Sequence, residues 1–306
     1  MIHGLIRVNK PPDITSHTVV DRVRKLFKVK KAGHFGTLDP SAEGLLLIGI
    51  GNATKFFDFY IKKRKLYSGH IVFGYATTTY DSEGEPLSEQ QPIDLRTLDL
   101  EALLSVFRGK QMQLPPIYSA KKFKGRPMYK YARENKSEEV EIKPMEVEIF
   151  SLEGRVVDET TLWFRAETSS GTYIRSLAHD MGQKVGVGAY LKGLIREGVG
   201  EFLLRDAFTL EQLEQYARSG EISAVVTPIE VLLPEIPKIV VGPGGRNAIL
   251  NGQPLLPEDV ARIISPKDQS KASDYFRLFD DEGKLLAIAR KEPKLMRFRP
   301  YIVFPN

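Results

Sequence analysis

The 306-residue sequence contains no cysteine and only five histidines. Without thiols the chain cannot form disulfides, cysteine nucleophiles, iron–sulfur clusters or any zinc site that uses sulfur. The histidines are His3, His17, His34, His70 and His179, and their spacing matches no metal-binding motif. We therefore expect no metal site.

Long hydrophobic runs are also missing. The longest, residues 44–50, is far shorter than the roughly 20 apolar residues that cross a bilayer. The first residues lack the basic and then apolar pattern of a signal peptide. These absences predict a soluble, cytoplasmic protein with no membrane partner. The length and the 42% hydrophobic content predict one large core and a smaller second domain.

Basic residues are only modestly in excess, with 44 Lys and Arg against 39 Asp and Glu, a net charge of +5. Their distribution is more informative, because they concentrate in residues 22–31, 62–65 and 121–126. A single cluster of this kind would be an ordinary solvated face. The clusters are interleaved with the aromatic residues Tyr67, Tyr118, Phe123, Tyr129 and Tyr131. The combination indicates a groove that binds nucleic acid.

The pattern of apolar residues predicts a mixture of strands and helices. Ser16 is expected to cap a helix whose apolar residues recur at helical spacing from Val19 to Phe27. Further strands are predicted at residues 5–8, 45–50, 66–73, 147–152 and 162–168, and further helices at 98–107, 173–184 and 210–217. Strands and helices do not alternate strictly. We therefore predict an α+β fold with a mixed, mostly antiparallel sheet flanked by helices.

A proline-punctuated segment at residues 232–237 predicts a boundary between domains 1–235 and 236–306. Short strands are expected after it, at residues 239–241, 276–279, 285–289 and 301–304. Turn sequences such as Asn251-Gly252 separate them. This spacing is typical of a small β-barrel.

A glycine-punctuated loop at residues 33–44 contains His34 and Asp39 and leads into a buried strand. Taken alone, Asp39 followed by proline reads as a turn residue. Tyr67 likewise reads as a strand aromatic, and Arg175 as a surface cation in the first turn of a helix. Spacing alone therefore does not identify chemistry at these positions.

Five motifs in the same chain are more specific in combination. They are Lys10-Pro11-Pro12 with Thr15-Ser16-His17, the loop 33–44, Lys65-Leu66-Tyr67, the segment 115–133, and residues 170–177. In this order they resemble the bacterial TruB-type tRNA pseudouridine synthases along essentially the whole chain. The segment 249–253 resembles part of a PUA domain, a small RNA-binding barrel. One departure is Ile195, where the family commonly has a basic residue after the leucine at 194.

The resemblance implies that the chain isomerises uridine 55 in the T-loop of tRNA to pseudouridine. The reaction breaks the N1–C1′ bond and rejoins the base through C5, so it needs no redox step and no cofactor. The resemblance assigns the essential carboxylate to Asp39, acting as a nucleophile or as a base. Arg175 would keep this carboxylate charged. Tyr67 would lie against the uracil, with its hydroxyl placed to help remove the C5 proton.

The resemblance also implies how the substrate is held. The target base must be flipped out of the folded loop, and His34 would fill the gap by stacking. Leu194 would pack beneath the flipped uracil. Lys10, Lys65 and Lys121 are expected to contact the RNA. We expect a monomer that acts on the T-arm stem-loop of tRNA, without guide RNA or DNA.

Three other functions fit parts of the sequence. A non-enzymatic RNA-binding or ribosome-assembly factor would also be basic, but it would not need Asp39, Tyr67 and Arg175 together. The guide-RNA-dependent relatives of archaea and eukaryotes share the Asp and Tyr motifs. The full bacterial pattern, including residues 115–133, favours a stand-alone enzyme instead. A hydrolase built on Asp39 and His34 would need a nucleophile elbow or suitably placed paired carboxylates, which no motif provides.

Overall fold

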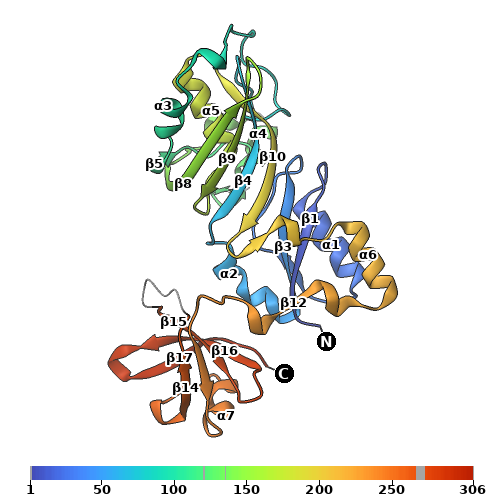
Figure 1. The fold of residues 1–306 in the computed structure, drawn as a ribbon, viewed down its shortest axis with the longest axis vertical. Coiled ribbons are helices and arrows are strands. Elements are labelled where there is room, and N and C mark those ends of the chain that lie inside the picture. The colour runs from blue at the N-terminus through green and yellow to red at the C-terminus, as the bar shows by residue number, and fades with distance from the viewer. Residues whose placement is uncertain (1, 120, 135, 267–272, 306) are drawn as a thin grey trace.

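The computed structural model describes residues 2–119, 121–134, 136–266 and 273–305. A large sheet carries helices on its faces, and a smaller β domain lies at one end of an elongated molecule (Figure 1). Within these ranges, no helix is both long enough and apolar enough to cross a membrane.

The helices are α1 (Ser16–Leu26), α2 (Phe57–Tyr60), α3 (Leu100–Ser105), α4 (Met128–Arg133), α5 (Ile174–Val185), α6 (Leu210–Ser219) and α7 (Gly245–Leu250). The strands are β1 (Gly4–Lys10), β2 (Ala32–His34), β3 (Glu43–Ile50), β4 (Lys65–Phe73), β5 (Gly109–Gln113), β6 (Lys122–Phe123), β7 (Arg126–Pro127), β8 (Met145–Val156), β9 (Thr161–Thr168), β10 (Ala189–Val199), β11 (Phe202–Leu203), β12 (Val226–Pro228), β13 (Lys238–Val241), β14 (Val260–Ile264), β15 (Tyr275–Phe279), β16 (Leu285–Glu292) and β17 (Arg297–Val303). Short 3₁₀ helices occur at Gly51–Phe56, Leu95–Thr97, Ser137–Glu139, Leu204–Asp206, Ile222–Val225, Ile229–Val231, Pro257–Asp259 and Pro293–Leu295.

The large sheet has the strand order β12-β1-β3-β10-β4-β9-β8-β5, with β2 paired to β3 and β11 paired to β10. Its neighbouring strands are antiparallel except β3 and β10, which are parallel. This confirms the predicted α+β fold with a mixed, mostly antiparallel sheet.

The two halves of this sheet meet at a short contact between β3 and β10, where Glu43 pairs with Ile195 and Gly44 with Arg196. A Cβ on Gly44 would lie 2.5 Å from the Arg196 carbonyl oxygen, and Gly44 has a φ of 101°. Only glycine fits both conditions without strain. The join therefore lies directly after the loop that carries Asp39.

Strand β3 is buried on both faces, which explains its continuous apolar sequence. Leu46 and Ile48 face the cluster formed with Val19, Val20 and Val23 of α1. Leu45 and Leu47 face the opposite cluster, because side chains alternate along a strand.

Helix α1 begins differently from the prediction, because Thr15 and not Ser16 is its N-cap. The Thr15 side chain accepts a hydrogen bond from the Thr18 backbone N–H at 3.0 Å. Ser16 is buried, and its hydroxyl lies within hydrogen-bonding distance of both the N–H (2.9 Å) and the carbonyl (3.0 Å) of Leu38. The cap prediction for Ser16 was wrong, and its side chain instead ties α1 to the loop before Asp39.

The C-terminal part of the chain forms a second sheet, in the order β14-β13-β15-β16-β17. Strands β13, β15, β16 and β17 of this sheet lie at or close to the positions where short strands were expected. Among the described residues the edge strands β14 and β17 do not pair, so closure of the sheet into a barrel is not shown.

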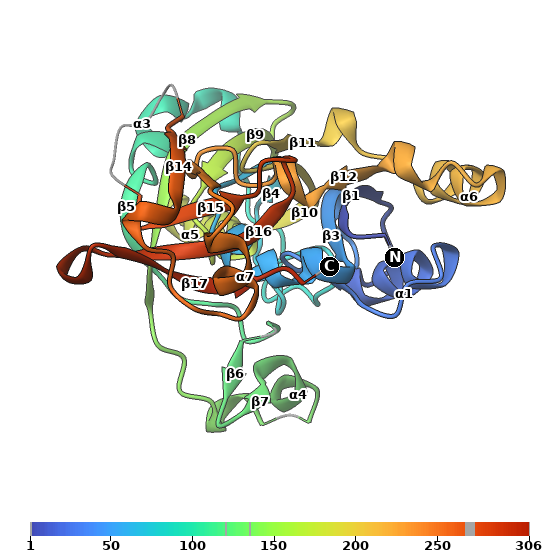
Figure 2. The ribbon, with the colours of Figure 1, turned by 90° about the horizontal axis from the view of Figure 1, so that it is seen from below.

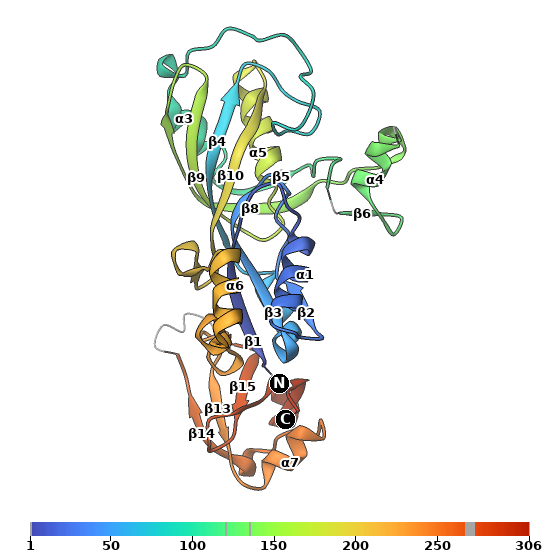
Figure 3. The same cartoon turned by 90° about the vertical axis from the view of Figure 1, so that its right-hand side faces the viewer.

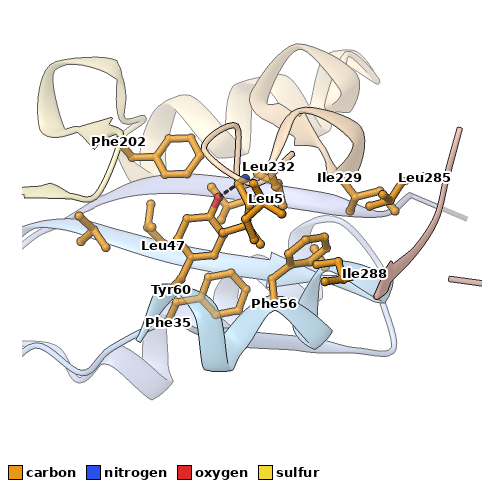
Figure 4. Packing of buried hydrophobic residues seen from close by; sticks show 14 of the residues in the cluster. Leu5, Phe35, Leu47, Phe56, Tyr60, Phe202, Ile229, Leu232, Leu285 and Ile288 are labelled. Atoms are coloured by element: carbon orange, nitrogen blue, oxygen red, sulfur yellow. Dashed lines mark hydrogen bonds between the residues drawn. The ribbon is translucent and has the colours of Figure 1, made fainter. Parts of the chain in front are cut away.

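The two sheets share a hydrophobic core. Leu5, Phe56 and Tyr60 pack in one buried cluster with Ile288 and Phe304 of the C-terminal domain, as Figure 4 shows for the labelled members. The Tyr60 hydroxyl accepts a hydrogen bond from the Leu233 backbone N–H at 3.2 Å, drawn as the dashed line in Figure 4. The interface is therefore a continuous apolar core, and the buried hydrogen bond holds the segment that leads into the second domain against α2.

An arm formed by β6, β7 and α4 stands away from the large sheet (Figures 2 and 3). It carries arginines over aromatic rings, with Arg126 5.1 Å from the Tyr131 ring centroid and Arg133 5.4 Å from that of Tyr129. The arm thus presents the basic and aromatic side chains that the sequence places at residues 121–133.

Candidate active site

The loop between β2 and β3 carries Asp39 and is fixed at the residues on both sides of it. Ser16 holds Leu38, as described above, and the Lys10 ammonium donates to the Pro40 carbonyl at 2.9 Å. Lys10 also donates to the carbonyls of Pro11 (2.9 Å) and Ile14 (2.8 Å). Asp39 therefore lies between two anchored neighbours.

A buried arginine anchors the start of the same loop. The guanidinium of Arg196, whose residue is 1% exposed, donates to the carbonyls of Gly36 (3.0 Å), Thr37 (3.2 Å) and Leu45 (2.8 Å). Among the described residues it has no carboxylate partner within ion-pairing distance. Neutral carbonyls thus satisfy this cation, and they belong to the loop of the site.

Asp39 pairs with Arg175 from the first turn of α5, with 3.0 Å between its Oδ2 and the arginine Nε. Gln113 fixes the entry to this helix, since its side chain accepts from the Tyr173 N–H at 2.8 Å and donates to the Tyr173 carbonyl at 3.0 Å. The structure thus brings together the two charged residues that the resemblance pairs, Asp39 and Arg175.

A second carboxylate, Asp81, shares the same arginine. Its Oδ2 lies 3.3 Å from the Arg175 Nη1, and the guanidinium also donates to the carbonyls of Thr79 (3.3 Å) and Tyr118 (2.9 Å). The Arg175 side chain is only 8% exposed, so these contacts fix its orientation. The sequence around Asp81 gives no sign of this role, because residues 77–84 have an ordinary turn composition.

The turn that carries Asp81 is itself held by α5. Tyr80 has a φ of 64°, a conformation that is rare for a bulky residue, and its ring stacks on His179 with 3.8 Å between centroids and 14° between planes. His179 lies one helical turn after Arg175. Helix α5 therefore contacts this turn through both a charged and an aromatic side chain.

The environment of Asp39 shifts its ionisation. Its side chain keeps 41% exposure but lies on the wall of a cavity, where protein atoms replace much of the bulk water. This desolvation raises the pKa of the Asp39 carboxyl above its ordinary value, and Arg175 opposes the increase. The negative charge of Asp81 acts in the same direction as burial. Arg175 is therefore the main group that favours the ionised carboxylate.

A cavity of about 490 Å³ opens beside Asp39. Tyr67 from β4 and Leu194 from β10 line it, as do Arg175, Lys65 and Lys62. Tyr67 and Leu194 also pack against the hydrophobic clusters on both halves of the sheet, which fixes the cavity wall. A volume of this size is ordinary for a site that binds a small organic group such as a nucleoside.

Two lysines expected to contact RNA are enclosed by backbone carbonyls. Lys10 is fully buried, and Lys65, which is nearly so, donates to the carbonyls of Ile61 and Lys63. Burial lowers the pKa of each ammonium to about 8. This geometry favours a structural role for both lysines over direct contact with a phosphate.

The remaining predicted residues lie outside the cavity lining. His34 is half-buried at the end of β2, and burial, together with the nearby Arg196, lowers its pKa below the ordinary value. This shift favours the neutral form of its ring. Lys121 lies at the base of the arm, with its ammonium 3.7 Å from the Met145 sulfur. Neither residue contacts Asp39 in this conformation.

The geometry supports acid–base or nucleophilic chemistry by one carboxylate next to a cavity. In the described ranges no group of three or more His, Asp or Glu side chains is placed to hold a metal ion. Asp39 and Asp81 flank one arginine and so resemble an oriented ion-pair network rather than an acid and base on opposite sides of a substrate.

Comparison with known proteins identifies the family. A model of the N-terminal domain of TruB family pseudouridylate synthases matches residues 24–174, and a tRNA pseudouridylate synthase B C-terminal domain model matches residues 175–234. The tRNA pseudouridine synthase B of Solibacter usitatus is 40% identical over 285 residues, which cover 93% of this chain and 94% of that protein. The Bacillus subtilis protein of the same name is 36% identical over 299 residues, covering 96% of this chain and 94% of that protein.

Solved structures show the same fold. A chain in an H/ACA RNP bound to a substrate RNA containing 2′-deoxyuridine matches with a TM-score of 0.75 and 21% identity, covering 99% of this chain and 85% of that chain. The archaeal box H/ACA sRNP Nop10-Cbf5 complex gives a TM-score of 0.74 and 22% identity, covering 99% and 86%. The structural likeness covers the described fold, and the sequence relatives extend along nearly the whole chain. The chain belongs to the TruB family of pseudouridylate synthases and is an enzyme that forms pseudouridine.

Proposed function

We propose that the chain isomerises uridine 55 in the T-loop of tRNA to pseudouridine, with Asp39 as the essential carboxylate. The observation that carries this proposal is the pairing of Asp39 with Arg175 beside a cavity lined by Tyr67 and Leu194. The curated relatives at 36–40% identity are named tRNA pseudouridine synthase B. Position 55 and the T-loop follow from the motif resemblance.

In the proposed reaction, the ionised Asp39 acts on the sugar of the flipped uridine, as nucleophile or as base, and the N1–C1′ bond breaks. The uracil turns, C5 bonds to C1′, the C5 proton leaves, and N1 carries a proton in the product. No atom is gained or lost overall. Arg175 supports this step because its guanidinium keeps the desolvated carboxylate charged.

The walls of the cavity fit the proposed roles around the base. Tyr67 would contact the uracil and assist removal of the C5 proton, and Leu194 would pack beneath the ring. His34 would stack in the gap left in the RNA. A neutral imidazole suits stacking on bases, and the lowered pKa of His34 favours that form.

For RNA binding we propose a division between exposed and buried cations. Lys62 is exposed at the cavity edge, and the arm carries Lys121 and its basic neighbours, so these residues would contact the RNA backbone. Lys10 and Lys65 would support the loops beneath. Recognition would then depend on the shape of the T-arm and on unstacked bases.

We further propose that residues 236–306 form a PUA-like RNA-binding domain following the catalytic domain of residues 1–235. A separate core of Ile239, Leu278, Leu286 and Ala289 supports this division. Phe304 also completes the core shared with Phe56, so removing the domain would expose apolar surface. Point variants are therefore better tests of its role than truncation. We expect the enzyme to act as a cytoplasmic monomer.

The decisive test is the substitution Asp39→Asn. Asparagine keeps the shape and the turn propensity of aspartate but removes the charge and the reactive oxygen. Purified protein is mixed with unmodified tRNA transcript at saturating enzyme, and pseudouridine is mapped and timed, with tRNA affinity measured on the same preparation. We expect the rate to fall by many orders of magnitude and the affinity to change by only a few-fold. Retention of more than about a tenth of the rate, a barrier change below roughly 1.4 kcal/mol, would refute the assignment.

The same reaction mixture separates the stand-alone enzyme from a guide-dependent one. The solved structures of H/ACA complexes resemble this chain at only 21–22% identity, whereas the relatives named tRNA pseudouridine synthase B reach 36–40%. Pseudouridine formed without added RNA or protein supports the stand-alone enzyme. Activity that requires a guide RNA would contradict it.

A further inference from the structure

A second cavity, of about 300 Å³, lies between α2 and the C-terminal domain. It is lined by Asp58, Phe59, Lys62, Glu235, Tyr275 and Tyr301, among others. Lys62 also lines the cavity beside Asp39. The two cavities are thus neighbours that share this lysine. The second cavity holds none of the residues to which the proposed reaction assigns a role in catalysis.

Three aromatic rings from both domains form one wall of this second cavity. The ring of Phe59 meets those of Tyr275 (5.2 Å between centroids, 80° between planes) and Tyr301 (6.2 Å, 83°) edge to face. Tyr275 and Tyr301 lie 5.6 Å apart at 61°. Tyr301 extends from the edge strand β17 and keeps 52% exposure. An exposed aromatic ring next to a cavity is the surface on which single-stranded nucleic acids stack their bases.

The charged groups around the rings suit a nucleotide. Lys62 is exposed and has no ion-pair partner within the part of the chain that the structure describes, so it can meet a phosphate. Lys63 beside it is already paired with Glu201 and Glu235. Asp58 and Glu235 add carboxylate oxygens, which accept hydrogen bonds from the exocyclic amino groups of adenine, cytosine or guanine. Uracil lacks such a group.

A further hollow, of about 490 Å³, is also lined by Tyr301, together with Lys55, Asp58, Ile302 and Val303. Tyr301 therefore borders both hollows. The Lys55 ammonium donates to the Val303 carbonyl at 2.6 Å, so among the described residues Lys62 is the lysine here that is free to meet a phosphate. An exposed lysine next to an exposed aromatic ring is the combination expected for binding a single RNA strand.

We propose that the cavity formed by Phe59, Tyr275 and Tyr301 binds a second unstacked nucleobase of the substrate RNA, one that carries an exocyclic amino group. The base stacks on Tyr301 while the target uridine occupies the cavity beside Asp39, and Lys62 contacts the phosphate between them. This inference rests on the proposed function, because it assumes that the substrate is an RNA loop. It adds a contact that fixes the direction in which the loop enters the site.

The test combines a protein change with RNA changes. Affinity for the T-arm stem-loop is measured for Tyr301→Ala, Tyr301→Phe and the otherwise unchanged protein, all carrying Asp39→Asn to prevent turnover. Stem-loops with an abasic nucleotide at each loop position other than the target are measured in parallel. Tyr301→Ala should weaken binding by about 5- to 100-fold, the range typical of losing one base–aromatic stack. Tyr301→Phe should bind nearly as well as tyrosine because the ring is kept.

The occupant is identified by coupling between the two changes. On the protein with Tyr301, the RNA that is abasic at one loop position should bind more weakly than intact RNA. On Tyr301→Ala, the same abasic RNA and intact RNA should bind equally well. A matched control is Leu295→Ala, an exposed apolar residue (58%) of the same domain outside these cavities, which should bind like the parent. Thermal unfolding of each variant shows whether the domain interface is intact.

Three results would overturn the inference. Equal affinity of Tyr301→Ala and the parent would mean that the rings only pack the domains together. The inference would also be overturned if no abasic position showed coupling with Tyr301→Ala, a result that can be checked with Tyr301→Phe and with Lys62→Ala. Coupling found only at a uridine would overturn it as well. In each case the unsubstituted enzyme would still form pseudouridine in tRNA, whereas failure of that reaction would instead refute the proposed function.

Discussion

Arg196→Met tests whether the buried arginine stabilises the protein through the catalytic loop. Methionine fills most of the space but cannot donate to the carbonyls of Gly36, Thr37 and Leu45, which Arg196 contacts at 2.8–3.2 Å. A buried acceptor left without a partner costs about 1–3 kcal/mol. Removing the cation also removes its own desolvation cost, which offsets part of this loss.

The balance of these effects predicts that Arg196→Met lowers the free energy of unfolding by about 3 kcal/mol, which is the lower end of the cost of leaving three buried acceptors unpaired. In a protein of this size that loss lowers the midpoint of thermal unfolding by roughly 5–10 °C. Two of the three carbonyls belong to the loop before Asp39, so the single-turnover rate of pseudouridine formation should fall at least about ten-fold. Affinity for tRNA should change much less.

Two controls sharpen the measurement. Arg196→Lys keeps the charge, but one ammonium cannot reach all three carbonyls as the guanidinium does, so both effects should be intermediate. Arg205→Met changes an exposed arginine and should leave stability and rate unchanged. The reasoning is refuted if Arg196→Met is as stable as the parent or more stable. The cost of burying an unpaired cation would then exceed the benefit of its three hydrogen bonds.

Three further predictions concern the same site. The rate of pseudouridine formation should fall in acid as Asp39 takes up a proton. Because Arg175 lowers the pKa of Asp39, Arg175→Met should move this acid limb of the pH–rate profile to higher pH. An acid limb that does not move would contradict the pairing of Arg175 with Asp39. Asp81→Asn should move the limb to lower pH, since Asp81 raises that pKa, while also lowering the plateau rate as Arg175 loses an orienting contact. Ser16→Ala should lower the free energy of unfolding, measured by urea titration, by about 2 kcal/mol, because the buried N–H and carbonyl of Leu38 lose their partner. It should lower the catalytic rate more than the affinity for tRNA. An unchanged rate would show that catalysis does not need this anchor.

The parts of the fold predicted correctly are those with a strong local pattern. Residues 45–50 are an uninterrupted apolar run because β3 is covered on both faces, and they lie within the observed strand. Strand β10 was not predicted, although it lies in the middle of the sheet. Its sequence includes Lys192, Gly193 and Arg196, and its strand conformation depends on pairing with β4 and β3. Local pattern carries no information about such pairing.

The site shows a similar division. Asp39 and Arg175 could be named because whole motifs resemble a family, and the fold places them 3.0 Å apart. The residues that hold them, Asp81, Ser16 and Arg196, come from distant segments of the sequence, and even the motif that contains Ser16 does not reveal what its side chain contacts. Their roles depend on tertiary contacts and on burial. A serine at the start of a helix, for example, is most simply interpreted as its N-cap. Only the structure shows that the Ser16 hydroxyl instead contacts the backbone of Leu38.

The core shared by the two sheets also affects how the protein is made. Phe56 and Tyr60 pack in one cluster with Phe304, and the rings of Phe56 and Phe304 stack 5.2 Å apart. On a ribosome that adds about 5–20 residues per second, the early aromatic residues wait roughly 10–50 s for this partner. During that time an apolar surface of the N-terminal half is exposed to chaperones and to neighbouring chains. Completion of the chain covers that surface and couples the unfolding of the two domains.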